Sequence, residues 1–202
     1  MSQPEPTPPT PLPQRPPRHA LQERVSAAIL EAAARTPASH GEQASMNDVA
    51  VTAGVARATV YRYFPNRKAL LEALAGVAVS DATSRLAAAR LDEVEVNEGV
   101  SRAVRALVEV GEYLLVVTRE RVRPDPEQFE QGINRPLCRL FERGRASGAL
   151  RDDVPSSWLT ESLVGLIGSV LPATPALGKE DTIAAISSMF LEGTHGRPRA
   201  SG

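Results

Sequence analysis

Residues 45–71, SMNDVAVTAGVARATVYRYFPNRKALL, decide the fold of this chain. Ser45, with Asp48 three residues later, fits the capping-box pattern that starts a helix. Gly54 should end that helix, because the position after a helix often needs a positive φ, which Gly adopts at little cost. A second short helix follows until Pro65, which cannot continue it. The segment is therefore predicted to form a helix-turn-helix.

The second of these helices, predicted from Arg57 to Phe64, has the composition of a DNA-reading helix. Val60 and Phe64 form its inward face at i and i+4. Between Arg57 and Lys68 there are four cations and no Asp or Glu. Arg can fork onto guanine, Thr can contact a base or a phosphate, and Tyr can reach a phosphate. Its outward face carries Arg57, Ala58, Thr59, Tyr61 and Arg62.

The stretch GVARATVYRYFPNRKALL closely resembles the recognition segment of the TetR family of bacterial transcriptional repressors. In that family a small residue and Thr precede Tyr-x-x-Phe, and a basic residue opens the next helix. The resemblance implies an all-α fold, with an N-terminal three-helix helix-turn-helix DNA-binding domain followed by a helical ligand-binding and dimerisation domain. It also implies a sequence-specific transcriptional regulator, a repressor released from a palindromic operator by a small-molecule ligand.

The resemblance and the residue chemistry together assign the DNA contacts. Base edges are expected to meet Arg57, Ala58, Thr59 and Asn47. Phosphates are expected to meet Tyr61, Tyr63 and Arg67, with Ser45 contributing if its hydroxyl is free. Arg62 and Lys68 complete the predicted surface. Alternatives remain open: Tyr63 could pack in the core, Lys68 could simply face solvent, and Arg62 could do either.

Two positions depart from the family pattern. Pro37 ends the first helix, predicted from His19 to Arg35, where relatives commonly have an aromatic residue and a longer helix. Ala56 stands where many relatives have a capping Ser, a change that typically costs about 1 kcal/mol. We expect the recognition helix to survive through the packing of Val60 and Phe64.

The chain divides into a head, a body and two tails. Residues 1–17 hold eight of the seventeen prolines and should form an extended tail. The alternative to a solvated tail is a basic arm, in which Arg15 and Arg18 enter the neighbouring minor groove. The DNA-binding domain is assigned to residues 18–75, the effector-binding and dimerisation domain to 76–196, and a flexible tail to 197–202.

The body is predicted to be helical throughout. A helix capped by Asn66 links head and body and contains Gly76. One long helix is expected over 97–121, followed by a break at 119–126. Further helices are predicted over 127–147, interrupted by Pro136, and over 156–171 and 180–193.

The last two helices carry wide apolar stripes that need a covering surface. In the resembled family these helices pair with their twins in a four-helix dimer interface. The expected interface residues are Leu159, Leu163, Leu166, Val170, Ile183, Ile186 and Phe190. The alternative is that the two helices complete the monomer's core.

Composition narrows the function classes. Residues 1–75 hold eight Lys or Arg and six Asp or Glu, whereas the remainder is acidic, within a net charge of −1. A basic head suits DNA binding at one end, and the alternative is a chance fluctuation of a few charges. The single Cys138 allows no internal disulfide and is expected to pack as a small apolar residue, with redox sensing as the alternative.

We expect a cytoplasmic homodimer that needs no cofactor or metal, binds double-stranded DNA and a small apolar effector, and has no contact with membranes. The scattered histidines lack metal-ligand spacing, and no catalytic motif is present, so we do not expect an enzyme. The alternative function is a helical protein-interaction module that uses the helix-turn-helix for a protein partner. A recombinase or sigma-type subunit would need further regions for which the chain has no signature.

Overall fold

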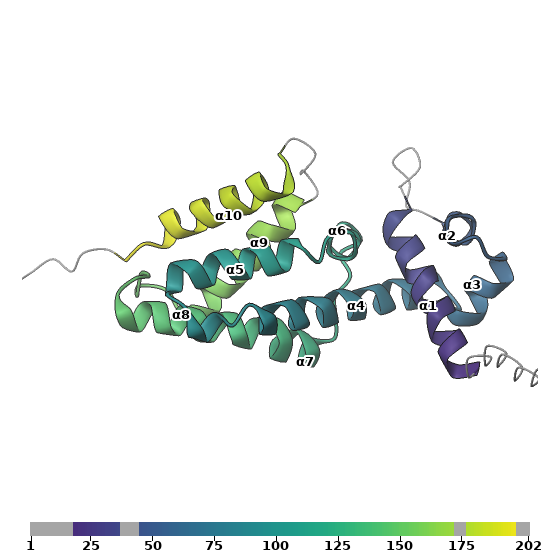
Figure 1. Ribbon diagram of the computed structural model, residues 1–202, viewed down its shortest axis with the longest axis horizontal. Coiled ribbons are helices and arrows are strands. Elements are labelled where there is room, and N and C mark those ends of the chain that lie inside the picture. Colours follow the sequence, from purple (N-terminus) through teal and green to yellow (C-terminus); the bar gives the residue numbers. More distant parts are fainter. Residues whose placement is uncertain (1–17, 37–44, 172–176, 197–202) are drawn as a thin grey trace, which may run out of the picture.

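The computed structural model describes residues 18–36, 45–171 and 177–196, which form helices joined by turns and no strand. This confirms the predicted all-α class. The molecule is elongated, with a head of α1–α3 at one end, a body of α5–α10 at the other, and α4 running between them (Figure 1). The elements are α1 (Arg18–Arg35), α2 (Met46–Ala53), α3 (Arg57–Tyr63), α4 (Arg67–Ala88), η2 (Leu91–Glu93), α5 (Val96–Val108), α6 (Glu112–Arg119), α7 (Pro126–Phe129), η3 (Glu130–Asn134), α8 (Arg135–Ser147), α9 (Ser156–Val170) and α10 (Lys179–Thr194).

The head forms around its own apolar core. Val60 is fully buried and Phe64 is 7% exposed, so both inward positions of α3 pack as the spacing predicts. They meet Ile29 of α1, Val49 of α2 and Leu70 of α4 in one cluster. Burial of these side chains fixes α3 against the other helices although its first turn lacks a side-chain cap. Pro37, predicted to end the first helix, and the N-terminal tail lie outside the described residues.

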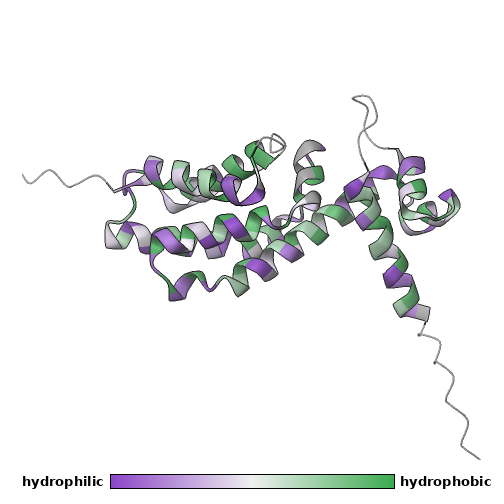
Figure 2. Ribbon diagram, turned by 45° about the horizontal axis from the view of Figure 1, so that its top comes forward, coloured by the Kyte–Doolittle hydropathy of each residue, from purple (hydrophilic) through white to green (hydrophobic). Residues whose placement is uncertain are grey.

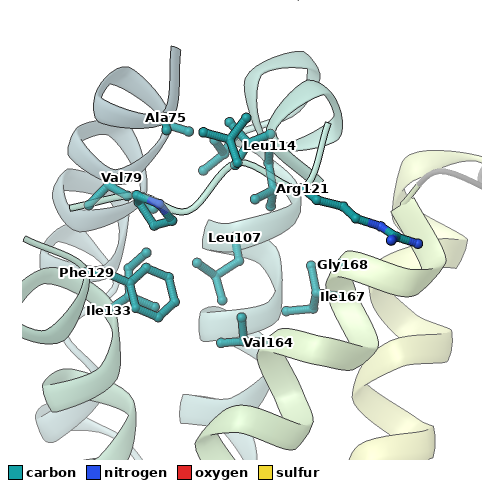
Figure 3. A pocket seen from close by; sticks show the side chains of 16 residues that line it. Ala75, Val79, Leu107, Leu114, Arg121, Phe129, Ile133, Val164, Ile167 and Gly168 are labelled. Carbon is teal, nitrogen blue, oxygen red and sulfur yellow. The ribbon is translucent and has the colours of Figure 1, made fainter. Parts of the chain in front are cut away.

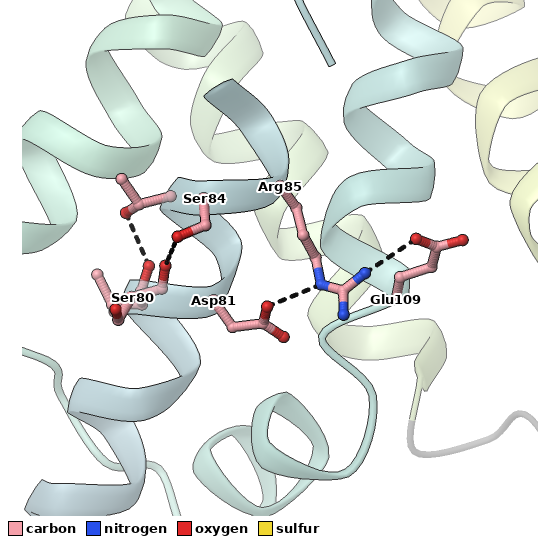
Figure 4. Close-up of polar contacts among 7 residues, drawn as sticks. Ser80, Asp81, Ser84, Arg85 and Glu109 are labelled. Atoms are coloured by element: carbon pink, nitrogen blue, oxygen red, sulfur yellow. Dashed lines mark hydrogen bonds and ion pairs between the residues drawn. The ribbon is translucent and has the colours of Figure 1, made fainter. Parts of the chain in front are cut away.

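Helix α4 belongs to both cores. Its first turns contribute Leu70 and Leu74 to the head cluster, and the next residue, Ala75, begins its contribution to the body cluster. In the body, Arg85 of α4 donates to Asp81 at 2.9 Å and to Glu109 after α5 at 3.0 Å (Figure 4). A movement of α4 therefore involves the head and the body together.

The long helix predicted over 97–121 is wrong. The chain forms α5 and α6 with a turn between them, and Gly111 adopts φ 65° in that turn. A residue in this left-handed conformation ends a helix, so the apolar pattern does not continue as one helix through Gly111. The break turns α6 out of line with α5, so that Tyr113 packs against both cores and Val116 packs against the head.

The interruption predicted at Pro136 is present as a π-turn. In η3 the backbone N–H of Arg135 donates to Glu130, five residues back. Pro136 has no N–H to offer to Gly132, and its ring would crowd that carbonyl. The chain widens by one residue in the preceding turn, which satisfies the backbone and lets α8 continue.

Helices α9 and α10 cover the body, and along the helices green and purple segments alternate as amphipathic packing requires (Figure 2). Five of the seven expected dimer residues have their side chains in the monomer's core, where a partner cannot reach them: Leu159, Leu163, Ile183, Ile186 and Phe190. For these five, the burial favours the alternative that the two helices complete the monomer's core, because an apolar stripe is as typical of a core as of an interface. Leu166 and Val170 are partly buried against the same core.

The outward side of α9 and α10 still carries apolar surface. Trp158 is 51% exposed and Met189 is 60% exposed. Gly165 is exposed, and a Cβ built there would meet nothing within 4 Å. None of the described helices is long and apolar enough to cross a membrane.

Candidate DNA-binding surface and ligand cavity

The turn between α2 and α3 presents α3 to solvent. Gly54 takes φ 66° and its N–H donates to the Ala50 and Val51 carbonyls, which ends α2. The N–H of Val55 donates to Ala50 at 3.1 Å. Since L-residues with a side chain rarely adopt this conformation, the tight corner depends on Gly54.

The outer face of α3 is exposed and cationic. Arg57 lies 5.3 Å from the ring centre of Tyr61, and its guanidinium donates to the Tyr61 hydroxyl at 3.3 Å. Arg62 lies 5.3 Å from the ring centre of Tyr63. Arg57, Ala58, Tyr61 and Arg62 are exposed, Asn47 at the start of α2 is also exposed, and Thr59 is half-buried. These side chains lie on the surface where the sequence places its base and phosphate contacts.

Three of the predicted phosphate contacts, Tyr63, Ser45 and Arg67, have other partners in this structure. Tyr63 is half-buried and packs against the head core. The Ser45 hydroxyl donates to the Asp48 carboxylate at 2.7 Å and accepts from the Asp48 N–H at 3.2 Å. The condition set for Ser45, a free hydroxyl, is therefore not met. The Asp48 carboxylate accepts from the Ser45 hydroxyl and, at 2.9 Å, from the Ser45 backbone N–H, and these two hydrogen bonds hold the pKa of Asp48 below its usual value.

Arg67, expected on a phosphate, forms a two-pronged ion pair with Glu120 at 3.0 and 2.8 Å. Its side chain is 30% exposed and that of Glu120 is 15% exposed. The pair joins the first turn of α4 to the residue after α6. Lys68 is more open: its side chain is 83% exposed, and its amino group lies 3.7 Å from Glu72.

The body encloses an apolar cavity of about 270 Å³ beneath α6 (Figure 3). This volume is near the lower end of the range of roughly 300–1,000 Å³ that is usual for small-molecule sites. Its walls come from α4, α5, α6, η3 and α9 and from the chain between α6 and η3. The lining residues are Ala75, Ala78, Val79, Ala82, Leu107, Val110, Leu114, Val117, Arg121, Val122, Pro124, Phe129, Ile133, Val164, Ile167 and Gly168.

Arg121 is the one ionisable side chain among the described residues that line this cavity. It is exposed, and its guanidinium extends away from the apolar side chains, past Gly168 (Figure 3). The enclosed part of the cavity therefore offers hydrocarbon contacts, with one positive charge at its edge. Such a site suits a compact apolar compound that carries no positive charge.

Sequence reasoning did not find the cavity or the partner of Arg67. The lining residues are spread from Ala75 to Gly168, and each belongs to an ordinary apolar stripe. Glu120 lies 53 positions from Arg67 in a charged loop. Neither arrangement has a local signal, because both depend on how α6 turns back across α4.

Known proteins resemble first the head of this chain and then nearly the whole of it. Residues 29–74 match the bacterial regulatory proteins of the tetR family. The HTH-type transcriptional repressor LfrR from Mycolicibacterium smegmatis is 36% identical over 141 residues, which cover 68% of this chain and 72% of that protein. The matched residues include all of α2 and α3 and the first turns of α4.

The fold agrees over nearly the whole chain. The crystal structure of the TetR-like regulator LfrR from Mycobacterium smegmatis in complex with proflavine has a TM-score of 0.68 and 27% identity, covering 87% of this chain and 99% of that one. AibR, in complex with isovaleryl coenzyme A and operator DNA, has a TM-score of 0.64 at 20% identity, covering 82% of this chain and 97% of that one. The second likeness concerns the fold alone.

Proposed function

Since this chain belongs to the tetR family of bacterial regulatory proteins and is a ligand-responsive DNA-binding transcriptional regulator, we propose that it is a repressor. As a dimer it binds an inverted-repeat operator, and a small apolar effector releases it. The observation that carries the proposal is the exposed outer face of α3, which holds Arg57 and Arg62 with no acidic residue from 49 to 71.

A two-fold dimer would form through the outward side of α9 and α10. Trp158 and Met189 supply exposed apolar area there. Gly165 and Ser169, also exposed, leave room for a second helix to approach closely. A two-fold axis brings the same patch of each copy together and presents two α3 helices to successive major grooves.

The effector would occupy the apolar cavity. Its walls favour a compact hydrocarbon or aromatic body, and Arg121 at the edge favours a neutral or anionic compound over a cation. The compound can release DNA only if it binds the released conformation more tightly than the DNA-bound one.

The route from cavity to head runs through two elements. The residues of α4 that line the cavity include Ala75, Ala78 and Val79. These three lie within three turns of the helix's first turn, which begins at Arg67. Leu114 and Val117 of α6 line it from above, and Glu120 just beyond α6 holds Arg67 in that first turn. A ligand that shifts α6 or α4 would therefore change the position of the head.

The test is release of a fluorescent operator duplex, followed by polarisation, with two ligands of equal chain length and opposite charge. We expect decanoate to release DNA at lower concentration than decyltrimethylammonium. Val79→Trp, which fills the cavity, should keep DNA binding and lose release, whereas Ala146→Trp on the exposed end of α8 should keep both. Equal release from both variants would place the effector elsewhere.

A further inference from the structure

A second recess lies on a different face of α4 from the apolar cavity. Thr83 lines this recess, whereas its neighbour Ala82 lines the cavity. It has a volume of about 390 Å³ and is bounded by the end of α4, the turn that includes η2, η3 and the first part of α8. We call it the basic groove, after the four arginines in its lining: Arg90, Arg135, Arg139 and Arg143. With Asp92 as the one acidic residue in that lining, four positive charges and one negative leave +3.

Two of these arginines have no counter-charge in the described part of the chain. Arg135 and Arg139 stand four residues apart on α8, and both are exposed. Like charges at this spacing repel each other on a helix. Neither guanidinium has an ion pair or hydrogen bond to the residues that the structure describes. An anion bound between them would remove the repulsion and supply the missing acceptors.

The other two arginines of the groove, Arg143 and Arg90, interact with the turn that follows α4. Arg143 donates to the Leu91 carbonyl at 2.6 Å and to the Val94 carbonyl at 2.8 Å, which holds the turn after α4 against α8. Arg90 has φ 49°, a left-handed conformation that residues with a side chain rarely adopt. Its only described ion pair is with Glu93 at 3.2 Å, and both side chains are mostly exposed, so solvent screens it.

The opposite wall is the π-turn η3. A Cβ at Gly132 would collide with the Thr83 hydroxyl, so only Gly allows this turn to lie so close to α4. Gly132 and Pro136 both line the groove. Turns of this kind occur frequently at functional sites, and this one borders the groove on one side and, through Ile133, the apolar cavity on the other.

The groove also offers apolar contacts. Ala87 is exposed and Pro136 is half-buried, and both belong to its lining. We propose that the basic groove binds a small phosphorylated organic anion of the nucleotide type, with its phosphates on Arg135 and Arg139 and its organic part on Ala87 and Pro136. The planar guanidinium fork matches phosphate oxygens. Arg90 follows the end of α4, a helix of 22 residues, so DNA on α3 would lie roughly 30 Å away and would not fill the groove.

Isothermal titration of the full chain without DNA tests this site, with ADP, pyrophosphate and adenosine as probes. We expect ADP to bind more tightly than pyrophosphate, and adenosine to show no binding. The double variant Arg135→Gln/Arg139→Gln should weaken ADP binding at least tenfold. The control Arg123→Gln/Lys179→Gln removes the same charge from exposed positions outside the groove and should leave the ADP affinity within twofold.

Four results would overturn the proposal. Absence of ADP binding, or equal weakening by both double variants, would reduce the groove to general surface charge. If pyrophosphate binds as tightly as ADP, the organic part of the ligand contributes nothing to affinity, and the groove is not a site for a nucleotide-type anion. Displacement of ADP by operator DNA would assign the nucleotide to the DNA-binding face. Retained operator binding by each variant serves as the check that the chain is folded.

Discussion

At the scale of single residues, α3 combines a buried face that is fixed by packing with an outer face that is free to meet DNA. Val60 has no exposed surface, whereas Arg57 and Arg62 lie over the rings of Tyr61 and Tyr63. Stacked rings limit the positions that the guanidinium groups can take, which lowers the entropy lost when they bind. The head is thereby prepared for DNA before DNA arrives.

Substitutions on this face should separate base reading from phosphate binding. We expect Arg57→Ala or Thr59→Ala to cost about 1–3 kcal/mol on the operator and much less on random DNA. Lys68→Ala should weaken binding to all sequences and flatten the salt dependence by about one unit. Titrations of operator and scrambled duplex at several salt concentrations measure both effects. Equal losses on the two duplexes for all three variants would contradict the assignment.

The capping box of α2 should depend on pH through Asp48. Its pKa in the folded chain is lowered by the hydrogen bonds with Ser45, so the stabilisation is present above the unfolded-state pKa. It is lost as the pH falls through the lowered folded-state pKa. We therefore expect the difference in unfolding free energy between the natural chain and Ser45→Ala to shrink as the pH falls from 6 to 3. A difference that stays constant over that range would exclude this role for Asp48.

At the scale of elements, the sequence predicted the helix ends that are set by single capping residues. Ser45, Gly54 and Asn66 mark helix ends in the sequence and do so in the structure. The uninterrupted helix over 97–121 failed at Gly111, because an apolar stripe cannot distinguish a continuing helix from two helices joined at a glycine. Pro136 could be predicted to disturb its helix, but the form of the disturbance depends on packing against α4.

The glycine inside α4 and the glycine that ends α2 should respond oppositely to substitution. Gly76 lies inside α4, and a Cβ there would meet nothing within 4 Å. Gly76→Ala should therefore stabilise the chain by about 0.4–1 kcal/mol, because Ala favours the helix and restricts the unfolded chain. Gly54→Ala should destabilise it, since Gly54 has φ 66°. Denaturant unfolding of both variants gives the two signs, and a destabilised Gly76→Ala would mean that α4 needs a weak point there.

The ion pair between Arg67 and Glu120 should couple α4 to the end of α6. Both side chains are largely buried and the contact is two-pronged, so we expect a coupling energy above the roughly 0.2–1 kcal/mol of exposed pairs. A double-mutant cycle of Arg67→Gln and Glu120→Gln in urea unfolding measures it. A coupling near zero would show that the pair does not join head and body.

At the scale of the whole molecule, the sequence alone could not distinguish core from interface. The stripe of Leu159, Leu163 and Ile186 was expected to face a partner, but it fills the monomer's own core. What remains outside is a narrower surface around Trp158 and Met189. The cavity could not be predicted from the sequence either, because its walls come together only after the chain has folded back on itself.

Dimerisation should therefore depend on the exposed residues rather than on the buried stripe. We expect Trp158→Glu to shift the chain from dimer to monomer at micromolar concentration, because it places a charge in the apolar contact. Glu161→Gln, one turn further along α9, is the mild control and should stay dimeric. Sedimentation velocity distinguishes the species. If the natural chain is itself a monomer at this concentration, the proposed dimer is wrong.

The most direct test of the central claim is selection of bound sequences from random duplex DNA at near-physiological salt. We expect enrichment of an inverted repeat whose half-sites lie one helical turn or a multiple of it apart, read by the paired α3 helices. We also expect Arg57→Ala to lose the enrichment. Weak, salt-sensitive binding without any enriched sequence would contradict sequence-specific repression, and it would favour a helical module that binds a protein partner.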